Sequence, residues 1–124
     1  MKRRSIIFLG IVIAFSLSNC KKDKVEEVAE EEEELKCENE ISFSGDIFTV
    51  ITNTCATTNC HDAGGAANGF VFENHNQISS NASIILSVIR HEAGVTNMPL
   101  GGDKLSKEFI DDFYCWIEQG KLDN

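Results

Sequence analysis

Proline, methionine, histidine and positive charge are all scarce in this chain of 124 residues. It holds one Pro, two Met and three His, and its 11 Lys and Arg face 20 Asp and Glu, for a formal net charge of −9. Proteins that bind nucleic acid need basic patches, so this composition excludes nucleic acid as a partner. Much of the negative charge lies in one run near the N-terminus, so it says little about the folded part.

The patterns of common enzyme classes are missing as well. Outside the acidic run, no carboxylate pair and no nucleophile–base pair stands out. The glycine-rich stretch 63–69 lacks the Lys-Ser/Thr that follows a phosphate-binding loop. A structural zinc site would need a second pair of ligands, which the sequence does not offer. We therefore expect a binding or carrier protein and not an enzyme.

A long membrane-spanning run is also lacking, because the apolar stretch Ile6 to Leu17 is too short to span a bilayer comfortably. With Lys2-Arg3-Arg4 before it, residues 1–19 have the layout of a secretory signal. The stretch Leu17-Ser18-Asn19-Cys20 resembles the lipobox of bacterial lipoproteins, which implies cleavage before Cys20 and a lipid on its thiol. Ordinary secretion and a retained anchor helix are the alternatives.

Residues 20–36 are predicted to be an extended, disordered tether. Its glutamates, including the unbroken run Glu30 to Glu34, repel one another, and few apolar side chains are present to be buried. We expect the tether to hold a folded domain, residues 37–124, away from a membrane of the bacterial cell envelope. An acidic stretch soon after a lipidated Cys resembles a surface-export signal, so the periplasmic and the surface face of the outer membrane both stay open.

Two thiols and an imidazole form the most informative stretch, Cys55-Ala-Thr-Thr-Asn-Cys60-His61. These are the groups that c-type haem attachment requires, because the thiols form thioethers with the haem and the adjacent His binds its iron. Four residues separate the cysteines in place of the usual two, and a longer loop can bulge while both sulfurs reach one edge of the macrocycle. A Cys55–Cys60 disulfide, or two ordinary thiols, is the alternative.

Three helices are predicted in residues 37–124. The first begins at Ser44, with Asp46 in its first turn, and leads directly into Cys55. The second begins at Ser79 or Asn81 and ends before Gly94. The third runs from Ser106, its cap, to Gly120.

Apolar side chains at helical spacing identify the faces that we expect to be buried. They are Phe43, Ile47, Val50 and Ile51 in the first helix, Ile84, Ile85, Val88 and Ile89 in the second, and Phe109, Ile110, Phe113, Trp116 and Ile117 in the third. Between the first two helices, the small-residue loop 63–69 suits close approach to a haem edge, and Phe70-Val71-Phe72 is expected to be extended or to pack on the haem.

Residues 43–124 resemble a small class I-like c-type cytochrome domain of a bacterial lipoprotein. The stretches that carry the resemblance are CATTNCHDAGG, NMPLGGDKLS and FYCWIEQG. The resemblance implies an all-α fold, with three to four short helices around one covalent haem c. It also implies His61 as the proximal ligand of the iron and Met98, in a Met-Pro loop before the last helix, as the distal ligand. His91 and His75 are competing distal ligands, and a Met98 that only fills a gap in the core is the plainer alternative.

The remaining cysteines are Cys37 and Cys115, if Cys20 carries lipid and the two cysteines of the haem motif carry haem. Cys115 lies opposite the apolar stripe of its helix, where it can meet the chain that enters the domain at Cys37. Four cysteines allow three disulfide connectivities, and the competing ones pair Cys55 with Cys60 or cross the two pairs.

Three functional hypotheses follow from this resemblance and its alternatives. The first is a monomeric, lipid-anchored monohaem electron carrier that serves redox partner proteins of the envelope, with a mid-to-high potential set by His and Met ligation. The second is a disulfide-stapled surface lipoprotein that binds a partner without haem. The third keeps the haem as a sensor or peroxidase-like site, which needs an open sixth position on the iron.

Overall fold

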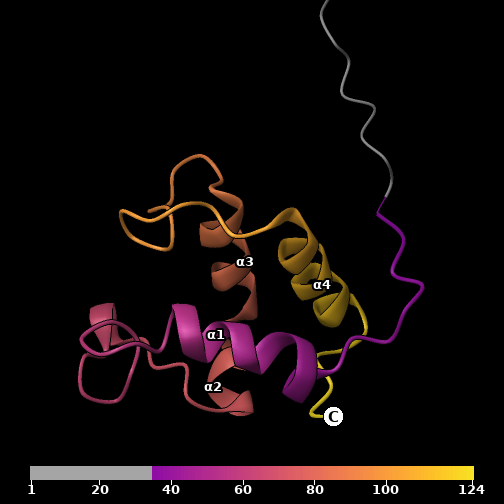
Figure 1. Ribbon diagram of the computed structural model, residues 1–124, viewed down its shortest axis with the longest axis horizontal. Coiled ribbons are helices and arrows are strands. Elements are labelled where there is room, and N and C mark those ends of the chain that lie inside the picture. Colours follow the sequence, from indigo (N-terminus) through magenta and orange to yellow (C-terminus); the bar gives the residue numbers. More distant parts are fainter. Residues whose placement is uncertain (1–34) are drawn as a thin grey trace, which may run out of the picture. The chain divides into compact units, whose positions relative to one another are not determined.

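The computed structural model describes residues 35–124, and these contain helices and loops but no β-strand (Figure 1). The prediction of an all-α fold is therefore confirmed for this range. The signal sequence, the lipidation at Cys20 and nearly all of the tether lie outside the described residues. None of the described helices is long and apolar enough to cross a membrane.

The first helical segment begins two residues earlier than predicted. A π-helical turn, η1 (Phe43–Ile47), continues directly into α1 (Phe48–Thr54). The cap is Ser42 and not Ser44: the Ser42 hydroxyl accepts from the Gly45 amide at 3.2 Å, and Asp46 accepts from the Ser42 amide at 2.8 Å. This reciprocal pair satisfies amides that a helix start leaves open.

The second helical region contains a short helix that the sequence pattern did not predict, α2 (His75–Ser80), ahead of α3 (Ala82–Arg90). The Asn74 side chain caps α2 by accepting from the Gln77 amide at 3.0 Å. Only Ile78 of its six residues is buried, so the sequence shows no helical spacing of apolar side chains from which α2 could be predicted. Asn81, one of the two predicted starts, is the N-cap of α3.

The last helix, α4 (Lys107–Glu118), agrees with its prediction. Ser106 caps it by accepting from the Phe109 amide at 3.2 Å. Phe113 and Trp116 are fully buried, and the Trp116 indole N–H donates to the carbonyl of Leu122 at 2.9 Å. Ile117 is only partly buried, at the edge of the stripe.

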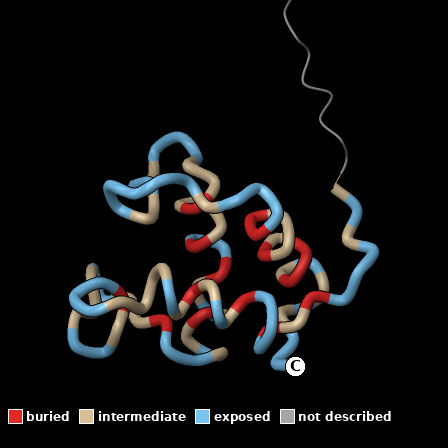
Figure 2. The backbone as a smooth tube through the Cα atoms, viewed as in Figure 1, coloured by how far each residue is buried: buried red, intermediate tan, exposed pale blue. Residues whose placement is uncertain are grey.

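The core lies where these helices meet. Helix α4 packs against α3 and against η1, and Figure 2 shows the buried positions on the faces that they turn toward one another. Ile47, Ile51, Ile78, Phe113 and Trp116 are all 0 % exposed. The loops that connect α1 to α2 and α3 to α4 are mostly exposed or half-buried (Figure 2).

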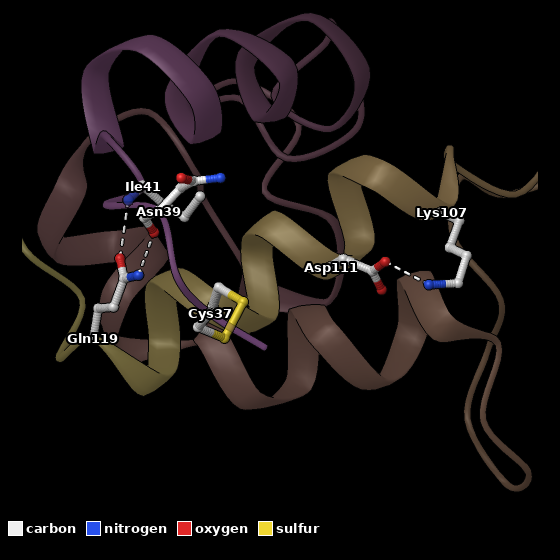
Figure 3. Close-up of a disulfide and its surroundings, with 7 residues drawn as sticks. Cys37, Asn39, Ile41, Lys107, Asp111 and Gln119 are labelled. Carbon is white, nitrogen blue, oxygen red and sulfur yellow. Dashed lines mark hydrogen bonds and ion pairs between the residues drawn. A yellow bond between two sulfur atoms is a disulfide. The ribbon is translucent and has the colours of Figure 1, made fainter. Parts of the chain in front are cut away.

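A disulfide joins Cys37 to Cys115 across a sequence separation of 78 residues, which confirms the predicted pair (Figure 3). The Gln119 side chain accepts from the Ile41 amide at 2.9 Å and donates to the Asn39 carbonyl at 2.7 Å. The entering segment is thus fastened along α4. Cys115 is only 5 % exposed although it lies opposite the apolar stripe, because the entering segment covers it, as its position on the helix predicted.

Candidate functional site

A cavity of about 550 Å³ opens between α3 and the two long loops, residues 55–74 and 91–106. Figure 1 shows both loops at the same end of the domain, beside α3. The volume lies within the range of ligand and cofactor sites in proteins. Among the described residues that line the cavity, none carries an Asp, Glu, Lys or Arg side chain. Its walls therefore suit a large apolar molecule.

The four residues predicted for haem attachment and ligation all line this one cavity. Cys55, Cys60 and His61 come from the first loop, and Met98 comes from the second. The packing of α3 between the loops brings the thioether to the same space as the imidazole and the thiols.

The imidazole of His61 is held in one orientation. The side chain is 9 % exposed, and its Nδ1 lies 3.2 Å from the carbonyl oxygen of Phe70. A carbonyl oxygen can only accept, so the neutral form of the ring carries its proton on Nδ1 and has its lone pair on Nε2. The ring of Phe72 lies against the imidazole, with centroids 4.7 Å apart. This is how proteins prepare a histidine to bind a metal through Nε2.

The Cys55 and Cys60 thiols are free within the described range, half-buried and exposed respectively. The competing pairings, with each other or crossed with the second pair, are therefore not those found. Burial raises the pKa of the Cys55 thiol; a hydrogen bond with the Thr54 hydroxyl at 3.4 Å opposes this, and the nearby Cys60 adds to it. Neither thiol is used in a disulfide, so both can bond to another group, with Cys55 less reactive than an ordinary thiol.

The four-residue spacer folds as a compact bulge. The His61 amide donates to the Cys55 carbonyl at 3.0 Å, and the Cys60 amide donates to the Thr57 carbonyl at 2.9 Å. Asn59 takes a left-handed conformation with φ 66°, which Asn tolerates better than most residues. These turns absorb the two extra residues of the motif and leave both thiols on the cavity.

Met98 is half-buried at the start of a Met98–Pro99 cis peptide bond. Its amide donates to the carbonyl of Val88 in α3 at 3.1 Å. The Nε2 of His91 lies 3.1 Å from the carbonyl oxygen of Met98. The backbone of Met98 is therefore held on both sides by the end of α3.

The two competing histidines do not line the cavity. His91 is engaged with the backbone of Met98. His75 is half-buried in the opposite part of the core, where its ring stands edge-on to Phe43 at 4.7 Å and its Nε2 lies 2.8 Å from the Lys121 carbonyl oxygen. Among the described residues, the imidazole and the thioether on the cavity come from His61 and Met98 alone.

Part of the apolar wall of the cavity comes from residues that the sequence pattern placed in a plain core helix. Ile84, Ile85, Val88 and Ile89 of α3 all line it. Ile84 is 40 % exposed, and Leu100, just after Pro99, is 78 % exposed. The signal in the sequence was the width of the apolar stripe, since Ile84 lies beyond the face that packs on α4.

Residues 35–124 contain no cluster of three or more His, Cys, Asp and Glu side chains placed to hold a metal ion. A haem iron takes its remaining ligands from the porphyrin, so one imidazole and one thioether are sufficient for it. Comparison of the chain with known protein families, with curated proteins and with solved structures found no match.

Proposed function

We propose that residues 37–124 bind one haem c covalently and transfer electrons. The observation that carries this proposal is the single cavity on which two free thiols, an oriented imidazole and the only thioether beyond the initiator Met come together. Each of these groups has a distinct part in haem c binding: the thiols attach the macrocycle, and the imidazole and the thioether bind its iron.

The residues present fit the cofactor in chemistry and in size. Cys55 and Cys60 would form the two thioethers, His61 Nε2 would be the proximal ligand and Met98 the distal ligand. The uncharged walls, with the α3 side chains and the Phe70 and Phe72 rings, would cover the apolar macrocycle. The bound haem would supply one-electron chemistry between Fe(II) and Fe(III).

The protein's own contribution is to set the potential and to keep reorganisation small. A thioether ligand raises the haem potential relative to a second imidazole, so a mid-to-high potential carrier is the expected type. The hydrogen bond from His61 to Phe70 keeps the proximal imidazole in one tautomer in both redox states. The apolar walls limit the water that would reorganise when charge changes.

In the cell, the proposed protein is a monohaem electron carrier of the bacterial envelope, anchored by lipid on Cys20 and exchanging electrons with redox partner proteins. The competing function without haem depended on two disulfides as staples. Residues 35–124 contain one, and Cys55 and Cys60 are free thiols.

The test is expression of the full chain together with c-type haem maturation machinery. We expect a Soret band, and a peptide spanning Cys55 to His61 that carries one haem mass after acid extraction. The Cys55→Ser, Cys60→Ser double variant is the control and should release its haem. A colourless wild-type protein with both thiols unmodified would overturn the proposal.

A further inference from the structure

His91 ends α3 in an unfavourable backbone conformation. It is the C-cap, with φ 59° and ψ 43°, in the left-handed region. Glycine is by far the commonest residue in such a position, because a side chain there crowds its own backbone. A histidine at a helix end where glycine is favoured points to a use for its side chain.

The side chain is used to hold the next loop. Its Nε2 lies 3.1 Å from the carbonyl oxygen of Met98, and because that oxygen can only accept, Nε2 is the donor. On the other side of the residue, the Met98 amide donates to the Val88 carbonyl at 3.1 Å. Between His91 and Met98, the residues from Glu92 to Asn97 are exposed or half-buried and give the loop little packing.

We infer that His91 is a positioning residue for Met98: its imidazole fixes the loop so that the thioether stays on the cavity. The inference rests on the proposed function, in which Met98 is the distal ligand. In this role His91 is not itself the distal ligand. It donates to the backbone of Met98 and so strengthens the bond of Met98 to the iron.

The left-handed backbone provides a discriminating set of variants. His91→Asn tolerates the same conformation, but its side chain is too short to reach the Met98 carbonyl. His91→Gln places an amide donor at a reach similar to that of Nε2 and should restore the bond. His91→Gly suits the backbone best and replaces His91→Asn if that variant does not fold.

Five measurements on the haem-loaded full chain test the inference. In His91→Asn we expect the near-infrared sulfur-to-iron band to weaken and the potential to fall. Added imidazole should bind the oxidised protein about two- to tenfold more tightly, which corresponds to the loss of one hydrogen bond. The Met98 amide should exchange its hydrogen faster by a similar factor, while the melting temperature changes little. His91→Gln should return each quantity toward the wild-type value.

The outcomes separate this inference from the proposed function. A wild-type protein that takes up no haem overturns both. A haem-loaded His91→Asn protein that matches wild type in band, potential and imidazole affinity overturns the role of His91 alone. Equal loss in His91→Asn and His91→Gln also overturns it, because a donor of similar reach would then make no difference.

Discussion

Gly65 lies directly against the backbone of Asn59. A β-carbon at position 65 would stand 2.5 Å from the Asn59 carbonyl carbon and 2.7 Å from Oδ1 of Asp62, both closer than real contacts allow. The Gly65 amide donates to that same Asp62 oxygen at 2.8 Å. The glycine-rich loop therefore supports the bulge between Cys55 and Cys60, and only a residue without a side chain fits at position 65.

Gly65→Ala is predicted to disturb this bulge. Because one of the clashing partners is backbone, the loop must move, at a cost of about 1–3 kcal/mol in the free energy of unfolding. Covalent haem yield should fall with it. The matched control is Gly64→Ala, whose β-carbon meets Asp62 at an ordinary 3.5 Å. Equal stability and equal haem yield in the two variants would contradict the prediction.

Loss of the Cys37–Cys115 disulfide should destabilise the domain without altering the cavity. The bond closes a long loop, and its removal by the Cys37→Ser, Cys115→Ser double variant is expected to cost about 2–4 kcal/mol in denaturant unfolding. Neither residue lines the cavity, so the haem spectrum of the folded variant should match that of the wild type. Cys60→Ser, at an exposed thiol, should leave the stability of the haem-free protein within about 0.5 kcal/mol.

The two free thiols should react differently with an alkylating reagent in the haem-free full chain. Cys60 is exposed and should react first. Burial raises the pKa of Cys55, so its rate should rise only at higher pH than for an ordinary thiol of pKa 9.0. Mass mapping of each peptide across a pH series measures both rates, and superimposable profiles would count against the burial of Cys55.

The raised pKa of the Cys55 thiol also makes the stability of the folded domain depend on pH. A raised pKa means that the folded state holds the thiol proton more tightly than the unfolded state does. The stabilisation is therefore complete below the ordinary pKa of 9.0 and is lost as pH rises through the raised value. In this pH window, the free energy of unfolding of the wild type should fall more steeply with rising pH than that of Cys55→Ser. Below the window, the two free energies should change with pH in parallel.

Met98→Ala is predicted to remove the near-infrared sulfur-to-iron band of the oxidised haem protein and to lower its potential, because the thioether favours Fe(II). Leu100→Ala is the control, since Leu100 also lines the cavity but is 78 % exposed and has no ligand atom. An unchanged band in Met98→Ala would favour the hypothesis of an open sixth position or a different ligand.

Local physical chemistry made several elements predictable. The Ser106 cap and the apolar stripe that follows it identify α4, because both act within a few residues of the chain. The same reasoning misplaced the cap of the first helix. The hydroxyls of Ser42 and Ser44 can both accept from a helix-start amide, but the Ser44 amide donates to the Asn124 carbonyl at 2.9 Å, a contact with the far end of the chain.

For the candidate site, the residue types were readable and their surroundings were not. The thiols, the imidazole and Met98 could be selected by chemistry and spacing. The contact of His91 could not, because a histidine that donates to a backbone carbonyl looks like any half-buried histidine in a sequence.

The amino-acid sequence by itself determined the helical class, the strongest helix and the candidate thiol, imidazole and thioether groups of the site, since these depend on side-chain chemistry and on neighbours within a turn or two. Only the tertiary structure decided that α3 brings Met98 to the same cavity as His61, that Cys115 is covered by the entering segment, and that His91 serves Met98. Each of these depends on which faces meet when the helices pack, and packing joins residues whose separation along the chain carries no periodic signal.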